Sequence, residues 1–403
     1  MIAKEWTEHK SERYFVFFYK ITIIIYILLT NLLYSFIFLL VQIIRNKYNN
    51  GRVLHMTNIE MIRAYGHEQV AYFNNEKAGL KAIIALHNTN LGPAVGGCRL
   101  WPYESEEAAL FDVLRLSRGM SHKNAAAGMP LGGAKGVIIA HPSEKTEAMF
   151  EAFGEAVNTF MGKYYTAEDV NTDTKDADYM LRTTQYVVGR EDVSGDPSPF
   201  TAIGVFDGIR AVAQFMNGSD SLDGMTIAVQ GLGKVGMDVA KKLHAAGAKL
   251  IVCNNSNREA MKYAVEELGA TEVGRDEIYG VECDIFSPCA LGAVVNPKTI
   301  PQFKCRAIAG AANNVIYDDA SGEALKARGI LYAPDFIING GGVINAGQEA
   351  FTTYDKENVL KQVHNIYNVV YRMLEESKAT GIPEGVIATN FAENRIKNGL
   401  DAD

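Results

Sequence analysis

Apolar and polar residues follow two different periods in the first half of the chain, and these predict a mixed α/β structure. Residues 80–88 (LKAIIALHN) and 132–140 (GGAKGVIIA) are short apolar runs with polar or glycine-rich borders, which is typical of buried strands. Between them, residues 105–128 open with Ser105 and two glutamates and then repeat apolar residues at helical spacing. This pattern predicts a helix with Ser105 as its N-cap. We expect a second amphipathic helix in residues 147–162 and a strand ending in acids in residues 163–170.

The second half of the chain alternates in the same way. Residues 195–199 hold two prolines and several turn-forming residues, so we expect a hinge there, followed by a helix. Residues 225–253 then give a strand, a glycine loop, a helix and a strand in that order, and residues 357–398 are mostly helical. This alternation predicts an α/β fold whose second part contains a parallel, doubly wound sheet.

The N-terminal segment departs from this pattern. Residues 21–44 form a run of 24 residues without a charge, long enough as a helix to cross a bilayer of about 30 Å. One interpretation is a single-pass membrane anchor. The other is that residues 1–55 are a mis-assigned start and that the natural product begins near Met56 or Met61. We favour the second, because the globular pattern begins only near Arg63 and continues without interruption.

Composition narrows the classes of function. The chain has 403 residues, of which 48% are apolar and 21% charged, as expected of a globular protein with about two domains. The formal net charge of −8 gives no basic surface for a nucleic-acid backbone, so we expect no nucleic-acid partner. The five cysteines include no CxxC pair, which argues against a disulfide framework or a zinc site and favours a reducing cytoplasm.

A glycine loop indicates a dinucleotide site. Gly231, Gly233 and Gly236 form a GxGxxG motif, with Lys234 and Val235 inside it, between a predicted strand and a predicted helix. Such glycines allow the tight turn, the approach of a pyrophosphate to the backbone and close packing of helix on strand. The next strand ends at Asn254, where a carboxylate usually binds the ribose 2′-hydroxyl. The choice between NAD and NADP is therefore open.

Polar residues in the first half suggest acid–base chemistry. Lys123 and Lys135 lie twelve positions apart, and the glycines around Lys135 would let a substrate approach the chain closely. A desolvated lysine near another cation loses proton affinity and becomes a usable base near neutral pH. Its partner would be Glu168 or Asp169.

Nine ordered sequence blocks carry a resemblance to a known family. They include GLKAIIALHNTNLGPAVGGCR, LRLSRGMSHKNAAAG, LGGAKGVII, TAEDV, GDPSPFTAIGVF, AVQGLGKVG, AGAANN and YAPDFIINGGGVIN. From about residue 63 to residue 398 the chain resembles the amino-acid dehydrogenases related to glutamate dehydrogenase, and within them the leucine dehydrogenase branch. The resemblance implies oxidative deamination of an aliphatic branched-chain L-amino acid to its 2-oxo acid and ammonia, with hydride transfer to NAD. NADP is not excluded.

The resemblance also implies a role for each part of the chain. Residues 56–195 would form a substrate-binding and oligomerisation domain, residues 196–370 a Rossmann-type dinucleotide-binding domain across a deep cleft, and residues 371–403 helices that return towards the first domain. A homo-oligomer is expected. Relatives with another apolar substrate (valine or phenylalanine) and a non-enzymatic NAD-binding module remain as alternatives.

Individual residues are assigned by the same resemblance. Lys123 would bind the substrate carboxylate, Lys135 would be the catalytic base, and Asp169 would shuttle protons, with no metal involved. Thr201 and Asn314 would hold the nicotinamide end. The side-chain pocket would be formed by small aliphatic residues without charge: Val95, Gly96, Ala167, Val343 and Ala346.

Overall fold

The structure is a computed structural model that describes residues 57–253, 257–290 and 292–402. Residues 61–403 form one compact unit. The apolar segment 21–44, the alternative start at Met56 and Asn254 lie outside the described residues. Within the described ranges, no helix is both long and apolar enough to span a bilayer.

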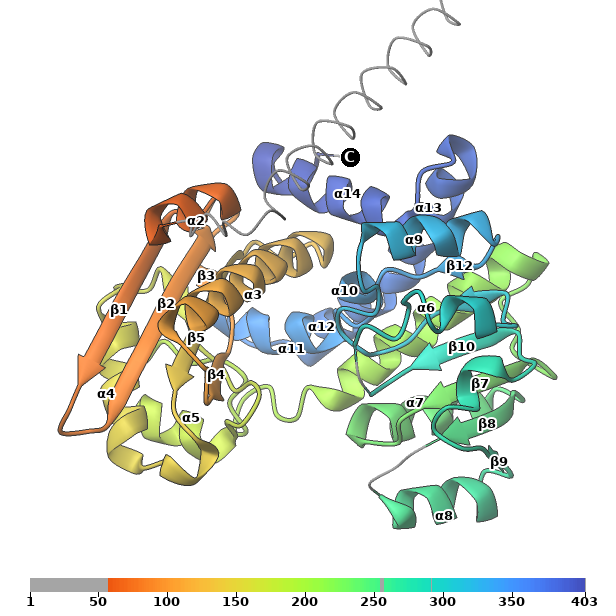
Figure 1. Cartoon of the computed structure of the whole chain (residues 1–403), viewed down its shortest axis with the longest axis horizontal. Helices are drawn as coiled ribbons and strands as arrows, with labels where there is room; N and C mark the ends of the chain where they lie inside the picture. Colours follow the sequence, from red (N-terminus) through yellow and green to blue (C-terminus); the bar gives the residue numbers. More distant parts are fainter. Residues whose placement is uncertain (1–56, 254–256, 291, 403) are drawn as a thin grey trace, which may run out of the picture. The chain divides into compact units, whose positions relative to one another are not determined.

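The first half of the chain builds a mixed sheet. Across the described residues, its strands follow the order β1-β2-β5-β3-β6, with β4 paired to β5 (Figure 1). β1 and β2, and β2 and β5, run antiparallel, whereas β3, β4 and β6 pair in parallel. The elements are α2 (Asn58–Tyr65), β1 (Gln69–Asn75), β2 (Leu80–Asn88), β3 (Ala94–Val95), β4 (Cys98–Trp101), α3 (Glu106–Ala126), β5 (Gly132–Ile139), α4 (Glu147–Asn158), β6 (Tyr164–Tyr165) and α5 (Thr174–Leu181).

Strand β2 is buried on both faces, which explains its continuous apolar run. Ile83 and Ala85 pack in a cluster with residues of α3, while Ile84 and Leu86 join a second cluster with Phe153 of α4. Alternate residues of a strand point to opposite faces, so each helix covers one face of the sheet. The prediction of a strand at residues 80–88 is confirmed.

Helix α3 begins where the sequence predicts. Ser105 is the N-cap, its hydroxyl accepts a hydrogen bond from the Ala108 backbone N–H at 3.1 Å, and Glu106 and Glu107 lie in the first turn. This geometry satisfies one N–H that the helix leaves unpaired and favours negative charge at its positive end. The helix runs along β2 and β5 and presents Lys123 in its last turn (Figure 1).

The second half of the chain builds a parallel sheet. Over the described ranges, its strand order is β12-β11-β10-β7-β8-β9, with every pair parallel. Numbered along the chain, this is the 3-2-1-4-5-6 order of a doubly wound dinucleotide-binding fold. The elements are α6 (Ser198–Asn217), β7 (Thr226–Gln230), α7 (Lys234–Ala245), β8 (Lys249–Cys253), α8 (Arg258–Glu266), β9 (Thr271–Glu272), β10 (Ile285–Pro288), β11 (Ala307–Ile308), α9 (Asp319–Ala327), β12 (Leu331–Tyr332), α10 (Asp335–Ile338), α11 (Gly341–Gly347), α12 (Lys356–His364), α13 (Ile366–Thr380) and α14 (Glu384–Asn398).

The predicted fold class is confirmed, and β7 shows its two-sided burial. Ile227 and Val229 belong to a core cluster with residues of α6 and α7, while Ala228 belongs to another cluster with Leu325 of α9. Helices therefore cover both faces of the second sheet, as a doubly wound fold requires. The boundaries at residues 195/196 and 370/371 stay a prediction.

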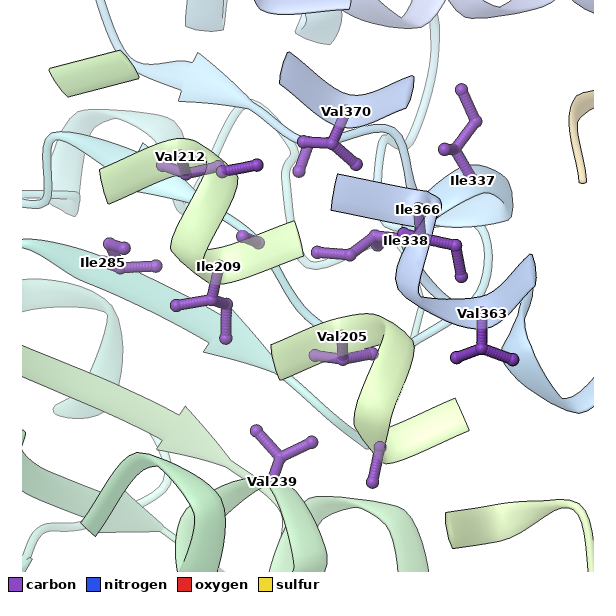
Figure 2. Packing of buried hydrophobic residues seen from close by; sticks show 14 of the residues in the cluster. Val205, Ile209, Val212, Val239, Ile285, Ile337, Ile338, Val363, Ile366 and Val370 are labelled. Carbon is purple, nitrogen blue, oxygen red and sulfur yellow. The ribbon is translucent and has the colours of Figure 1, made fainter. Parts of the chain in front are cut away.

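Helix α6 is the centre of the larger core. Figure 2 shows Val205, Ile209 and Val212 of α6 among side chains from β10, α7, α10, α12 and α13. Two glycines one turn apart permit this packing: a Cβ on Gly204 would lie 2.6 Å from Ile366 Cδ1, and one on Gly208 would lie 2.4 Å from Ile338 Cγ1. The helix begins at Ser198, inside the segment 195–199 that was expected to be a hinge, because Pro197 and Pro199 fit a helix start.

Helix α14 returns to the first half of the chain. It packs on α3, and Arg395 Nη1 donates to the Ala125 carbonyl at 3.2 Å. Arg118 of α3 pairs with Glu393 of α14 at 2.9 Å. These contacts brace the end of α3 that carries Lys123.

Candidate active site

A cleft of about 680 Å³ lies between elements of the two halves of the chain. Its lining comes from β3, α3 and β5 on one side and from α6, the start of α7, and α10 to α11 on the other. It contains Lys123, Lys135, Asp169, Thr201, Asn314, Val235 and the five predicted pocket residues. Residues scattered over about 250 positions of sequence thus share one concave site, as expected of an enzyme with a domain interface.

Lys135 and Asp169 form an ion pair in the cleft. The Lys135 Nζ lies 2.7 Å from Asp169 Oδ1, and the two side chains are 6% and 21% exposed. Lys135 projects from β5, whereas Asp169 follows β6 in a loop whose backbone is tied to β4: the Asp169 N–H donates to Thr172 Oγ1, which donates to the Cys98 carbonyl. Of the two acids that the sequence offered, Asp169 therefore reaches Lys135.

The charges around Asp169 favour its ionised form. Burial alone would raise the pKa of this carboxyl, but the attraction of Lys135 and Arg99 holds it well below its usual range. Glu168, next to it, is exposed, and its pKa is raised by partial desolvation. The two neighbouring acids differ because only the carboxylate of Asp169 faces two cations.

Lys123 lies in the same cleft in a different environment. Its Nζ donates to Asn313 Oδ1 at 3.2 Å, and the same oxygen accepts from Asn339 Nδ2 at 2.7 Å. Burial lowers the pKa of Lys123 to about 8, and Lys135 adds repulsion, while Asp335 and Asp169 oppose the shift. An ammonium bonded to a neutral amide retains the capacity to pair with an anionic ligand.

The glycines around Lys135 serve a different purpose from the one predicted. A Cβ on Gly132 would lie 2.0 Å from the Asn88 carbonyl oxygen, one on Gly133 would lie 2.1 Å from the Ser121 backbone nitrogen, and one on Gly136 would lie 2.5 Å from Phe153 Cζ. All three neighbours are parts of the protein. These glycines therefore allow β2, α3 and α4 to approach β5 closely, and do not leave room for a substrate.

The residues of the predicted side-chain pocket all line the cleft, and they come from both of its sides. Val95 and Gly96 lie at the end of β3, Ala167 follows β6, and Val343 and Ala346 lie on α11. Val188 and Gly189 add to the same lining. The pocket contains aliphatic surface, and a charged side chain on a ligand would find no partner among these residues.

The glycine loop has the geometry of a phosphate cradle. Gly231 adopts φ +96°, and a Cβ on Gly236 would lie 2.1 Å from the Gly231 carbonyl oxygen, so neither position tolerates a side chain. Gly233 is the N-cap of α7, makes no side-chain cap, and has open space where its Cβ would be. The start of a helix beside open space suits an anionic diphosphate. The residues present therefore fit a dinucleotide cofactor.

The two residues predicted to hold the nicotinamide end, Thr201 and Asn314, both line the cleft. Thr201 Oγ1 donates to the Pro197 carbonyl at 3.1 Å and lies 2.7 Å from where a Cβ on Gly342 would be. Asn314 adopts φ +51°, a left-handed conformation uncommon for a side-chain-bearing residue. The Asp335 carboxylate accepts the adjacent Val315 N–H at 2.8 Å and so holds this loop.

The adenosine end of the predicted site is only partly described. Asn254 is outside the described residues, and the exposed Lys234 side chain lies 3.4 Å from Asp196 near the predicted hinge. Arg258, which could meet a 2′-phosphate, is instead paired with Glu272 at 3.0 Å. The Arg258 guanidinium is therefore already paired with the Glu272 carboxylate in this structure.

Several polar residues of the cleft escaped the sequence analysis, among them Arg99, Asn313, Asp335 and Asn339. Arg99 follows the GGC triplet and Asn313 precedes Asn314, so both stood beside motifs that were already noted. Asp335 and Asn339 lie on and just after the short helix α10. Only the packing of that helix against the AANN loop brings them to the site.

Family comparisons agree with this arrangement. Residues 67–186 match the family described as Glu/Leu/Phe/Val dehydrogenase, dimerisation domain. Residues 196–262 and 253–397 match Glutamate/Leucine/Phenylalanine/Valine dehydrogenase. Both halves of the chain thus match the same group of enzymes in the expected order.

Individual relatives give the same result. The chain is 51% identical over 341 residues to a leucine dehydrogenase from Bacillus cereus, which covers 84% of this chain and 93% of the relative. It is 42% identical over 350 residues to a phenylalanine dehydrogenase from Caldalkalibacillus thermarum, with 85% and 94% coverage. The crystal structure of L-tryptophan dehydrogenase from Nostoc punctiforme superimposes with a TM-score of 0.77 at 43% identity, covering 85% of this chain and 99% of that one.

Proposed function

Because this chain belongs to the Glu/Leu/Phe/Val dehydrogenase family, we propose that it oxidatively deaminates aliphatic branched-chain L-amino acids with NAD, and catalyses the reverse reductive amination. The observation that carries the proposal is the Lys135–Asp169 pair at 2.7 Å in one cleft with Lys123, Thr201 and the start of α7. A base, a proton acceptor, a carboxylate anchor and a dinucleotide loop are the parts that this reaction needs.

The reaction sets the tasks of the side chains. An L-amino acid, water and NAD⁺ become a 2-oxo acid, ammonium, NADH and a proton. The bound dinucleotide supplies the acceptor for the hydride that leaves the substrate Cα. The protein must hold the amino acid by its carboxylate, remove protons from its amino group, and direct water to the resulting iminium carbon.

Lys123 is the proposed anchor for the substrate carboxylate. Its Nζ bonds to the neutral Asn313 amide, which a carboxylate would replace with a charge-assisted hydrogen bond. Asn339 donates to the same Asn313 oxygen and keeps that amide within reach of the lysine. The anchor thereby fixes the orientation of the substrate Cα relative to Lys135.

Lys135 is the proposed base. In its neutral form, Nζ accepts a proton from the substrate ammonium group and later from the water that attacks the iminium carbon. Asp169 Oδ1, 2.7 Å away, exchanges that proton with Lys135. Closure of the two sides of the cleft would exclude bulk water and leave one water for the attack.

Substrate preference follows from the neutral pocket. Val95, Ala167, Val343 and Ala346 offer aliphatic contact and no cation for a second carboxylate, so leucine, isoleucine and valine are favoured over glutamate. An apolar pocket discriminates by only ~1–3 kcal/mol per methylene, so we expect a broad preference. Phenylalanine or tryptophan as the preferred substrate is the second candidate, since relatives at 42% and 45% identity carry those names.

NAD is the proposed cofactor, with weak discrimination against NADP. Glu272 pairs with Arg258, which weakens the case for a 2′-phosphate site. Glu272 also lies on β9 beside the end of β8, where its carboxylate would repel a 2′-phosphate. The informative measurement is the ratio of kcat/KM for NAD to that for NADP. A ratio above about 10³, roughly 4 kcal/mol, would mean that another group supplies the selectivity. A ratio below one would overturn the choice of NAD.

Oligomeric state and location complete the proposal. We propose a homo-oligomer, because residues 67–186 match a dimerisation domain and because this part of the chain exposes large apolar side chains such as Tyr72 and Phe111. Light scattering of the purified protein tests this, and a monomer at micromolar concentration contradicts it.

We also propose a cytoplasmic location, consistent with five free cysteines. Cell fractionation tests it.

A substrate panel tests the activity itself. Purified protein is assayed for NADH formation with L-leucine, L-isoleucine, L-valine, L-phenylalanine, L-tryptophan and L-glutamate, with D-leucine as the stereochemical control. We expect the largest kcat/KM among the three branched-chain substrates and none with D-leucine. A largest value for glutamate, or no turnover with any L-amino acid, contradicts the proposal.

A further inference from the structure

Asp169 has a second cationic neighbour that the reaction above does not use. Arg99 Nε donates to Asp169 Oδ2 at 2.9 Å, while Lys135 bonds to the other oxygen, Oδ1, at 2.7 Å. The carboxylate is therefore held at both oxygens, by one cation each. Arg99 projects from β4, which pairs in parallel with the strand that carries Lys135.

Arg99 is itself fixed from behind. Its Nη1 donates to Asp112 Oδ2 at 3.0 Å, and Asp112 also accepts from the Tyr103 hydroxyl at 2.7 Å and from Arg115 Nη2 at 2.7 Å. The Arg99 and Asp112 side chains are only 20% and 16% exposed. A guanidinium bridging two carboxylates in this way has little freedom to rotate.

We propose that Arg99 is a positioning residue for proton transfer, holding Asp169 by Oδ2 so that Oδ1 stays directed at Lys135. This inference rests on the proposed deamination activity. When Lys135 is neutral and acts as a base, it no longer supplies a positive charge to Asp169, whereas a guanidinium stays protonated throughout. Arg99 then keeps the half-buried carboxylate ionised and able to receive a proton.

Other groups around Asp169 do not replace Arg99. Lys123 on α3 and Lys135 on β5 also supply positive charge near Asp169. However, Lys123 bonds to Asn313, and Lys135 is the proposed base and is therefore neutral when it accepts a proton. The remaining titratable neighbours disfavour negative charge on Asp169 or carry none: Asp112, Tyr103, Cys98 and Tyr164. Burial of Asp169 raises its pKa, and the attraction of Lys135 and Arg99 outweighs that effect.

The experiment compares Arg99→Gln and Arg99→Lys with the wild-type chain over a range of pH. Lys135 must be neutral to act as the base, so the acidic limb of the kcat/KM profile reports the loss of a proton from the coupled Lys135–Asp169 pair. Removing a cation in contact with this pair raises its proton affinity. We therefore expect the acidic limb of the kcat/KM profile of Arg99→Gln to move up by about one unit or more, with kcat reduced on the order of tenfold to a hundredfold. KM for leucine should change less than kcat. Arg99→Lys retains the charge and should keep the limb within about half a unit of wild type.

Arg182→Gln is the matched control. Arg182 also bridges two carboxylates, Glu147 and Glu151, but it lies outside the cleft and its side chain is 51% exposed. This variant should have the wild-type profile. Thermal unfolding of all variants shows whether each is folded. If Arg99→Gln is not folded, two separate variants, Arg99→Lys and Asp112→Asn, are compared with wild type in its place. Asp112→Asn should lower kcat while leaving the acidic limb close to that of wild type, because the guanidinium remains.

Two results overturn the inference. One is an Arg99→Gln enzyme with a wild-type acidic limb. The other is an equal loss of kcat in Arg99→Gln and Arg99→Lys with unshifted limbs and a lower Tm, which a purely structural role would give. Absence of turnover in the wild-type chain with every L-amino acid is a different outcome, since it contradicts the proposed function and not the role of Arg99 alone.

Discussion

Two lysines in one cleft receive different environments from their elements. Lys123 lies in the last turn of helix α3 and contacts a neutral amide, whereas Lys135 lies within a strand and contacts a carboxylate. The pKa of Lys123 falls to about 8 because burial removes water from its ammonium group. Residue type alone made the two lysines equivalent candidates, and their different contacts support the separate roles proposed for them, Lys123 as anchor and Lys135 as base.

Replacement of Lys135 by alanine tests the proposed base. We expect Lys135→Ala to lose more than 90% of deamination turnover, at least about 1.4 kcal/mol, because no other amine reaches Asp169 Oδ1 in the described residues. Cofactor affinity, measured by NADH fluorescence titration, should stay within about threefold of wild type, since the glycine loop belongs to the other sheet. Residual turnover above a tenth of wild type excludes Lys135 as the base.

Ala346 is the residue proposed to set the depth of the side-chain pocket. It lies on α11, and its Cβ would be 3.6 Å from a Cβ placed on Gly189. Ala346→Val adds two methyl groups at this point, so we expect the ratio of kcat/KM for valine to that for leucine to rise by about tenfold, or ~1.4 kcal/mol. Steady-state kinetics with both substrates measure it. An unchanged or lower ratio places Ala346 outside the substrate pocket.

At the scale of elements, the sequence predicted those segments whose own residues fix the local structure. Strand β2 and the N-cap of α3 were found because an apolar run and a Ser-Glu-Glu start are local signals. Strand β1, QVAYFNN, was missed because it is an edge strand with alternating exposed positions. Residues 163–170 were expected to form one strand, but only Tyr164–Tyr165 do, because the chain then turns to place Asp169.

The same reasoning explains what could be predicted of the site. Lys123, Lys135, Asp169 and the glycine loop lie in compact motifs, so sequence was sufficient to nominate them. Arg99 and Asp335 act through contacts made across strands and loops distant in sequence. An isolated arginine or aspartate has no periodicity or spacing that distinguishes it from a surface charge.

Three histidines cluster beside helix α3: His67 before β1, His87 in β2, and His122 on α3 itself. His67 contacts Ser117 at 2.7 Å and His87 contacts Ser121 at 2.8 Å, both serines being on α3, and His122 is next to Lys123. Burial lowers the pKa of His67 and His122 to about 4 and, with repulsion from its neighbours, that of His87 to about 3. All three are therefore neutral in the folded chain at neutral pH.

This cluster makes stability depend on pH. In the unfolded chain these histidines bind protons near their ordinary pKa of 6.5, whereas in the folded chain they do so only near pH 3 to 4. Their contribution to the free energy of unfolding is therefore complete above pH 6.5 and is lost as the pH falls towards 3 to 4. His87→Asn, which can retain the bond to Ser121, should lose less stability than wild type between pH 6.5 and 4, by on the order of 2 kcal/mol. Urea unfolding at several pH values measures this. Parallel curves for both proteins contradict it.

At the scale of the molecule, the two halves of the chain line a single cleft, the first with residues of its sheet and of α3, the second with helices and loops beside its sheet. In the second sheet, the strand order reverses between β7 and β10, and ligands bind at that point in doubly wound folds. Sequence alternation predicted the parallel sheet. The mixed first sheet, with β4 and β3 both paired to β5, depends on contacts between distant segments and was not predicted.

Residues 61–403 form a compact unit, and the family match begins at residue 67. We therefore expect a chain that starts at Met56 to keep kcat/KM for leucine within about twofold of the full-length chain, or less than ~0.4 kcal/mol. Both proteins are purified and assayed side by side, and their Tm values are compared. A large loss of activity or of thermal stability in the shorter chain shows that residues 1–55 contribute to the folded enzyme.

Positions around the cleft differ in which substitutions they tolerate, and the glycines at its base tolerate the fewest. A Cβ on Gly96 would lie 1.7 Å from the Ala134 carbonyl oxygen and one on Gly97 would lie 2.3 Å from that of Glu168, so backbone meets backbone beneath the reacting groups. Val343 and Ala346, on the opposite wall, are half-buried and can change size without moving the chain. Selection for new substrates would therefore accumulate substitutions on α11 and leave the glycine base intact. A lineage built on this chain can diversify in what it consumes while its proton-transfer chemistry is inherited unchanged.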